Sequence, residues 1–152
     1  MSNDLLKVLH IQQPHSGACL PTCAAMILNY LQRPVPIKQL SNLFGTRFYG
    51  TPSSRITRLQ QSGFRVTYQE LTTFDELQHW IKSGHPPIVS IMTGFLDYWI
   101  ENTVHAVVVV GVDERYVYVN DPYFASAPQK TLIDGFLAAW IEMDEMAAII
   151  ER

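Results

Sequence analysis

Gln13-Pro14-His15-Ser16-Gly17-Ala18-Cys19 is the stretch that decides the fold, because it places an amide side chain six residues before a cysteine that opens an apolar helix. Residues 24–31 form an uninterrupted helical pattern, and Pro21 suits a first turn, where its missing N–H costs little. Cys19 therefore lies at or next to a helix N-terminus. The unpaired N–H groups and the positive dipole end stabilise an anion there, so we expect Cys19 to be a reactive thiolate.

A nucleophilic thiol needs a base, and His105 is the histidine in a comparably ordered setting. It opens the run 105–112, His-Ala-Val-Val-Val-Val-Gly-Val, which is rich in β-branched residues and too short to span a membrane. This run predicts a buried strand. Residues 116–120, Tyr-Val-Tyr-Val-Asn, follow after the polar connection 113–115, so the two runs predict a hairpin.

The register of this hairpin decides whether a carboxylate reaches the histidine. With a three-residue loop, Val112 faces Tyr116, and Asp121 lies diagonally across from His105 on the same face of the sheet. A two-residue loop would reverse that facing. A carboxylate at Asp121 would hold the His105 imidazole in one tautomer. Together with Cys19 and Gln13, these residues would form a complete acyl-transfer site.

The same residues resemble a known family. Gln13, five intervening residues and Cys19 precede Cys-Ala-Ala-Met at 23–26, His105 opens a valine run, and Asn-Asp-Pro at 120–122 closes the next strand. This arrangement is similar to that of the bacteriocin-processing, double-glycine leader peptidases, which are papain-like cysteine peptidase domains usually fused to ABC exporters. The resemblance covers nearly the whole chain. It implies an α+β papain-like fold, with the cysteine in an N-terminal helical part and the histidine and aspartate in a C-terminal antiparallel sheet.

The resemblance also implies the roles of the site residues. Cys19 would be the nucleophile, His105 the base, Asp121 the orienting acid and Gln13 the oxyanion donor, with no metal or organic cofactor. The activity it implies is cleavage of a peptide bond in a leader or other exposed peptide. One position departs from the family, which usually has glycine where this chain has Leu20. We expect this side chain to obstruct or reshape the groove, so that a glycine here would improve cleavage of a double-glycine leader.

Composition indicates one compact domain spanning residues 1–152. The chain is 47% hydrophobic and 16% charged with a formal net charge of -3, which suffices for one ordinary core and argues against nucleic-acid binding. Residues 1–7 lack the features of a signal peptide, and no apolar stretch reaches about 18 residues. We therefore expect a cytoplasmic protein without membrane insertion, whose partners are a peptide or protein substrate and, in any export role, a separate ABC exporter.

Local signals predict further elements along the chain. Thr73 and Glu76 resemble a capping box for a helix ended by Gly84, and Ser53 or Ser54 is the expected cap of another helix. Strands are expected to dominate from residue 86 onward. The predicted helices are 37–44, 55–61 and the capped helix to residue 83, and the remaining predicted strands are 64–68, 86–91 and 147–150.

Each functional interpretation has a structural alternative. Cys23 is better explained by core packing, a Cys19–Cys23 disulfide is not expected in a cytosolic chain, and a zinc site would lack a fourth ligand. Gln13 would hydrogen-bond its own loop, Asp121 would form a turn before a proline, and the aromatic stretch 95–100 would either wall a cleft or pack in the core. The same triad also serves transferases and deamidases, and a degenerate site would leave a peptide-binding domain.

Overall fold

The structure is a computed structural model and describes residues 4–152. A six-stranded antiparallel sheet with strand order β1-β6-β2-β3-β4-β5 forms its centre. The elements in chain order are α1 (Cys19–Tyr30), α2 (Ile37–Phe44), the 3-10 helix η1 (Ser53–Ser62), β1 (Arg65–Gln69), α3 (Phe74–Lys82), β2 (Ile88–Met92), the short 3-10 helix η2 (Thr93–Phe95), β3 (Val104–Val112), β4 (Tyr116–Asn120), β5 (Gln129–Leu132), α4 (Ile133–Ile141) and β6 (Ala147–Glu151). The predicted α+β architecture is confirmed.

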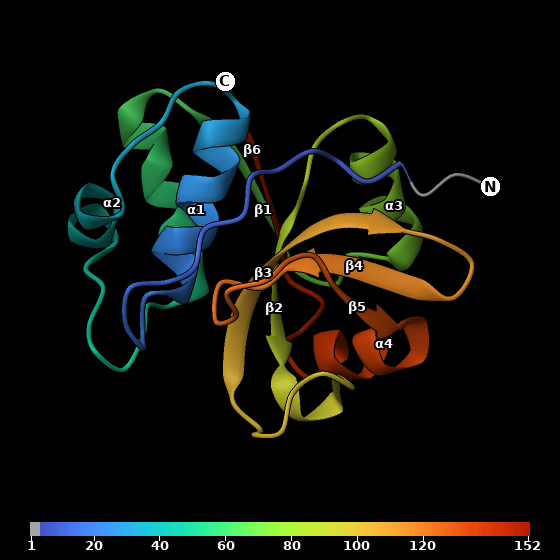
Figure 1. The fold of residues 1–152 in the computed structure, drawn as a ribbon. Coiled ribbons are helices and arrows are strands. Elements are labelled where there is room, and N and C mark those ends of the chain that lie inside the picture. Colours follow the sequence, from blue (N-terminus) through green and yellow to red (C-terminus); the bar gives the residue numbers. More distant parts are fainter. Residues whose placement is uncertain (1–3) are drawn as a thin grey trace.

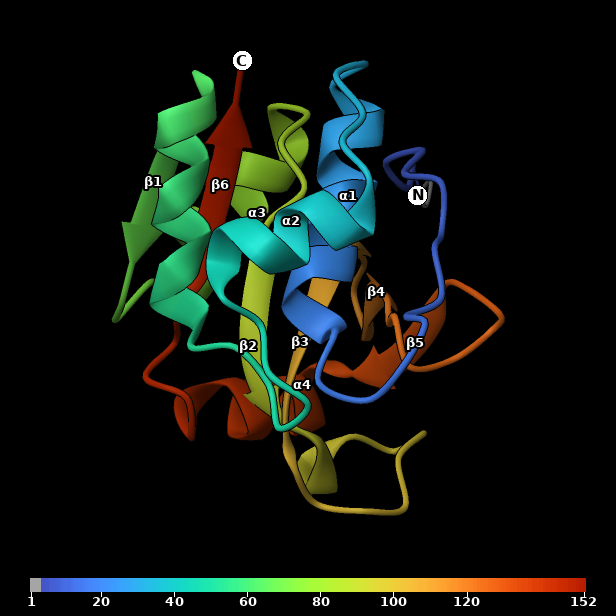
Figure 2. The same ribbon diagram turned by 90° about the vertical axis from the view of Figure 1, so that its left-hand side faces the viewer.

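Helices cover both faces of the sheet. The helices α1, α2 and η1 lie on one side, while α3 and α4 lie on the other (Figures 1 and 2). Alternate residues of β3 belong to the two cores, with Ala106 and Val108 packed toward α1 and Val107 and Val109 packed toward α4. Burial on both faces explains why β3 reads as an unbroken valine run rather than as an alternating pattern.

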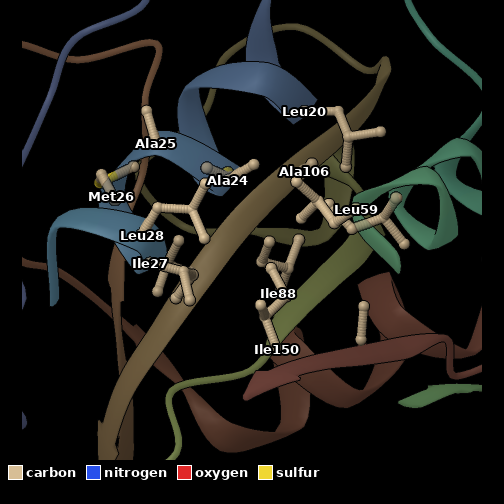
Figure 3. Packing of buried hydrophobic residues seen from close by; sticks show 14 of the residues in the cluster. Leu20, Ala24, Ala25, Met26, Ile27, Leu28, Leu59, Ile88, Ala106 and Ile150 are labelled. Carbon is tan, nitrogen blue, oxygen red and sulfur yellow. The ribbon is translucent and has the colours of Figure 1, made fainter. Parts of the chain in front are cut away.

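Helix α1 is the most deeply buried helix of the fold. Its residues from Leu20 to Leu28 are all buried, and its side chains lie beside Ala106, Ile88 and Ile150 of the sheet (Figure 3). A helix that is apolar on all sides is stable only in such an enclosed position. The first turn of α1, which carries the cysteine, is therefore held firmly against the sheet.

Most predicted elements are present, with their ends set by local signals. Gly45 ends α2 in the left-handed conformation at φ 66°, and Thr73 and Glu76 form the capping box of α3. The prediction that Ser53 or Ser54 caps the helix after α2 was wrong, because η1 begins after Pro52 without a side-chain cap. This element is also a 3-10 helix. Helix α3 has Ser83 as its C-cap, and Gly84, which the sequence predicted to end this helix, follows in the left-handed conformation at φ 88°.

The prediction for the C-terminal third was incomplete. Strand β5 and helix α4 lie between β4 and β6, in a region where strands were expected to dominate and no helix was predicted. Helix α4 buries Phe136, Ala139 and Trp140, which recur at helical spacing, against the second face of the sheet. Among the helices in residues 4–152, none is both long and apolar enough to cross a bilayer.

Candidate active site

Cys19 is the first residue of α1, directly after the N-cap residue Ala18. The preceding loop turns at Gly17, which has a φ of 85° and lies against the carbonyl of Phe48. The backbone N–H of Gln13 donates to the Pro122 carbonyl at 2.7 Å. This bond ties the cysteine loop to the loop that follows β4.

A β-bulge sets the register that brings Asp121 to His105. Val112 pairs with Val117, so the predicted pairing of Val112 with Tyr116 was wrong. The register shifts by one residue between Val109 and Gly111, and beyond this bulge Val108 pairs with Asn120. Continued by one residue, this register sets Asp121 diagonally across from His105, as the sequence predicted.

The carboxylate of Asp121 is fully buried and accepts four hydrogen bonds. Its Oδ1 accepts from His105 Nε2 at 2.7 Å and from the Tyr123 backbone N–H at 3.0 Å. Its Oδ2 accepts from the Tyr98 hydroxyl at 2.7 Å and from Trp99 Nε1 at 2.8 Å. Every acceptor position of the carboxylate that faces the protein is thus matched by a donor, which fixes its orientation toward the imidazole.

Tyr98 and Trp99 are the site residues that sequence reasoning missed. The aromatic stretch 95–100 was noted only as a cleft wall or as core, whereas Tyr98 and Trp99 within it hold Asp121. The ring of Trp99 also lies 5.2 Å from the His105 ring and 4.6 Å from the Tyr123 ring. A pair of aromatic side chains with polar donors close before a candidate histidine was the available signal.

The charges of the site favour a thiolate beside an imidazolium. Burial alone raises the pKa of Cys19, but hydrogen bonding and charge attraction from His105, with the Ala106 and Leu20 N–H groups, lower it below its ordinary value. Burial alone lowers the pKa of His105, but hydrogen bonds to Asp121 and Cys19 and the charges of both raise it to about 9. Since Nε2 of His105 is bonded to Asp121, Nδ1 is the nitrogen left for the thiol.

Asp121 is the fixed negative charge of this arrangement. Burial alone raises the pKa of its carboxyl, but the hydrogen bond and charge of His105 and the hydrogen bonds from Trp99 and Tyr123 lower it below its usual value. An ionised Asp121 stabilises the protonated imidazole, and the protonated imidazole stabilises the thiolate. The three groups can therefore hold a nucleophilic sulfur near neutral pH.

The second cysteine has the opposite character. Cys23 is fully buried in the core, and burial raises the pKa of its thiol well above the ordinary value, so this thiol stays protonated. Both cysteines are free. Within residues 4–152, no group of three or more His, Cys, Asp and Glu side chains is arranged to hold a metal ion.

The Gln13 side chain lies in the loop before Cys19 and bonds within that loop. Its Nε2 donates to the His15 carbonyl at 3.2 Å, while its Oε1 is buried without a partner among the described residues. Gln13 thus hydrogen-bonds its own loop through one of its two amide N–H groups, which is the alternative that the sequence left open. Gln13 is not among the residues that line the cleft shared by Cys19 and His105, and its oxyanion role stays a prediction.

Leu20 has a structural role that its position beside Cys19 did not indicate. Its side chain is 1% exposed and belongs to the core under α1, where Figure 3 shows it near Ala106 and Leu59. It borders a cleft at the candidate site, but most of its surface is in the core. The cleft has a volume of about 560 Å³ and is lined by both Cys19 and His105.

Comparison with known proteins finds one matching family. Residues 5–148 match the family described as the Peptidase_C39 like family. The chain is also 26% identical over 122 residues to the uncharacterized protein YvpB of Bacillus subtilis (strain 168), a match that covers 77% of this chain. The chain spans 45% of the length of that relative.

Three solved structures have the same fold. A putative C39-like peptidase from Bacillus anthracis superposes with a TM-score of 0.83 at 20% identity, covering 100% of this chain and 98% of that one. The peptidase domain of Streptococcus ComA, a bifunctional ABC transporter involved in a quorum-sensing pathway, superposes with a TM-score of 0.77 at 18% identity. This match covers 95% of this chain and 98% of that one. A double-glycine-motif protease from an AMS/PCAT transporter, in complex with a leader peptide, superposes with a TM-score of 0.70 at 21% identity. This match covers 97% of this chain and 93% of that one. The predicted papain-like peptidase fold is confirmed.

Proposed function

Because the chain belongs to the Peptidase_C39 like family, we propose that it is a cysteine peptidase that cleaves a peptide bond in a leader or other exposed peptide. The observation that carries the proposal is the 2.7 Å hydrogen bond that holds His105 to the buried Asp121, with His105 and Cys19 lining the same cleft. A carboxylate, an imidazole and a thiol joined in this order supply the orienting group, the acid–base group and the nucleophile of acyl transfer.

In the proposed reaction, the Cys19 thiolate attacks the carbonyl carbon of the scissile bond. The negative charge that develops on the carbonyl oxygen is stabilised by the Cys19 backbone N–H and by an N–H of the Gln13 amide. The His105 imidazolium then gives its proton to the leaving nitrogen as the C–N bond breaks, which leaves an acyl thioester on Cys19.

Water completes the cycle. His105, now neutral, removes a proton from a water molecule whose oxygen attacks the thioester carbonyl. Collapse of this second intermediate releases the carboxylic acid product and restores the thiolate beside the imidazolium. Asp121 keeps its charge throughout and stabilises each protonated state of His105.

The substrate proposal rests on the structural relatives. One is a protease bound to a leader peptide, and another is the peptidase domain of an ABC transporter. We propose that residues 1–152 act as one peptidase domain in the cytoplasm on an exposed leader, as in bacteriocin processing, with an ABC exporter as its partner in any export.

Labelling with a thiol-reactive epoxide tests the proposed chemistry. We expect the epoxide to modify Cys19 and to leave Cys23 unmodified, because Cys19 is partly exposed with a lowered pKa, whereas Cys23 is fully buried with a raised pKa. The site of modification is read by mass spectrometry of tryptic peptides. Cys23→Ala is the matched control and should be labelled like the wild type.

Cleavage assays complete this test. Cys19→Ala and His105→Ala should abolish turnover of a peptide library while their thermal melts show folded protein. Selective labelling of Cys19 without cleavage of any peptide would point instead to a transferase or a binding domain. Labelling that is lost in Cys23→Ala would refute the assignment of the nucleophile.

A further inference from the structure

The cleft beside Cys19 and His105 lies on the face of the sheet that α1 and η1 cover. Ser90 of β2 and Ala106 of β3 are directly opposed in the sheet, and both line the cleft. Tyr68 of β1 and Ser53 of η1 also line it, and their hydroxyl oxygens are 3.1 Å apart. The cleft is therefore built from sheet and helix residues as well as from loops.

The outer rim of the cleft is fixed to the cysteine loop. Tyr49 lines the cleft, is 75% exposed and packs edge-on against Phe48 with ring centroids 5.1 Å apart. Arg47 and Gly50 pair in an isolated bridge that closes the turn carrying these rings. Since Gly17 packs directly against the Phe48 carbonyl, the rim and the thiol form one connected unit.

The lining of the cleft is neutral apart from the thiol and imidazole of the site itself. It contains no Asp, Glu, Lys or Arg side chain, so a cation entering it would lose its water without gaining a carboxylate partner. A carboxylate entering it would compete with the Cys19 thiolate for the His105 imidazolium. Its volume of about 560 Å³ lies in the usual range for ligand pockets. A glycine would leave most of this space unfilled.

Ser90 gives the cleft a polar point at its base. This residue is 4% exposed, and it is one of the residues that line the cleft. A nearly buried hydroxyl next to a substrate site favours a ligand group that can donate or accept a hydrogen bond. The neutral lining and this hydroxyl together suit an amide better than a carboxylate or a hydrocarbon tip.

We propose that this cleft binds a large neutral side chain with a hydrogen-bonding tip, such as glutamine, at a substrate residue beside the scissile bond. The enzyme then selects its cleavage site by this side chain rather than by a pair of glycines. This inference rests on the proposed peptidase function and concerns only its specificity. Ser90 would contact the tip of the bound side chain, and Tyr49 would cover its stem.

A peptide series with one varied residue near the cut tests the inference. At the position that fills the cleft, we expect glutamine to exceed glycine and glutamate by about tenfold or more in kcat/KM, the range expected for a filled pocket and for rejection of a charge. Glutamine should exceed the similarly shaped methionine by about threefold to tenfold, which corresponds to one neutral hydrogen bond. In Ser90→Ala, the preference for glutamine over methionine should vanish.

Two further variants make the test decisive. Ser62→Ala, at the exposed end of η1, is the matched control and should keep the wild-type preference. Thr103→Phe, at an exposed rim position, should narrow the cleft and lower cleavage after glutamine relative to glycine even if Ser90→Ala fails to fold. The rate of Cys19 alkylation in Ser62→Ala should equal that of the wild type, since this residue lies outside the cleft.

The failures of the two proposals are distinguishable. Efficient cleavage that requires glycine on the acyl side, with no change in Ser90→Ala or Thr103→Phe, would overturn this inference and leave the peptidase function standing. Labelling of Cys19 without cleavage of any peptide would overturn the peptidase function, and this inference with it.

Discussion

Asp121→Asn should damage both the stability and the activity of the protein. The carboxylate accepts bonds from four donors, two at each oxygen, and an amide replaces one of these oxygens with an NH2 group. If the NH2 faces Tyr98 and Trp99, the Trp99 N–H meets another donor. If it faces His105 and Tyr123, the Tyr123 N–H loses its acceptor and the imidazole must change its tautomer.

The expected loss of stability in Asp121→Asn follows from the number of hydrogen bonds that the amide cannot accept. Each arrangement leaves at least one buried donor unpaired, at about 1–3 kcal/mol, and removes the charge that strengthens the other bonds. We expect a loss of about 2–4 kcal/mol in the free energy of unfolding, which lowers the Tm of a chain of this size by roughly 5–12 °C. Turnover should fall by much less than in His105→Ala, because the thiol keeps the imidazole and the helix N-terminus.

Thermal melts and peptide-cleavage kinetics measure the two effects on the same samples. Asp4→Asn, at an exposed aspartate, is the matched control and should melt with the wild type. Tyr98→Phe removes one donor and leaves Trp99 on the same oxygen, so it should lower the Tm less than Asp121→Asn. A Tm of Asp121→Asn within about 2 °C of wild type would refute the hydrogen-bond argument.

Three further predictions follow from the site. The pKa of His105 is raised from its ordinary 6.5 to about 9, so kcat/KM should fall as the imidazolium deprotonates above pH 9. Asp121→Asn should move this fall to lower pH, and an unchanged pH profile in the variant would contradict the pairing of His105 with Asp121. Gly17→Ala should lower activity by more than tenfold, because a Cβ there would lie 2.5 Å from the Phe48 oxygen at a φ of 85°; wild-type kinetics would exclude that close contact. Leu20→Gly should lower the free energy of unfolding, measured by calorimetry, by about 3–5 kcal/mol, since it empties a core position in a helix. A Tm near wild type with faster cleavage of a double-glycine leader would instead support the expectation that Leu20 obstructs the groove.

The elements that could be predicted are those with short-range causes. The capping box of α3 needs only Thr73 and Glu76, and the end of α2 needs only the left-handed Gly45. The placement of Cys19 at a helix start likewise follows from the apolar run after it and from Pro21. Each of these signals lies within a few residues of the feature it determines, so no knowledge of the tertiary structure is required.

The elements that could not be predicted depend on distant contacts. Tyr98 and Trp99 reach Asp121 only because the loop between β2 and β3 folds back over the end of β4. That loop is itself held by α4, where Gly135 packs directly against the Phe95 carbonyl. Helix α4 was missed along with this contact, although its apolar positions recur at helical spacing. The support of the site thus comes from the part of the chain with the weakest local signals.

The position of Asp121 was predicted correctly from a hairpin that was partly wrong. The connection is one residue longer than expected, because Val112 pairs with Val117, and on its own this would turn Asp121 to the other face of the sheet. The bulge at Val110 adds one residue to β3 and restores the original facing at the end where His105 lies. The main chain at this bulge also has a partner, since the Leu6 N–H donates to the Val110 carbonyl at 2.8 Å. The longer connection and the bulge thus compensate for each other. The site can still be inferred from its chemistry, because His105 and Asp121 must meet to function. The backbone path that brings them together is visible only in the structure.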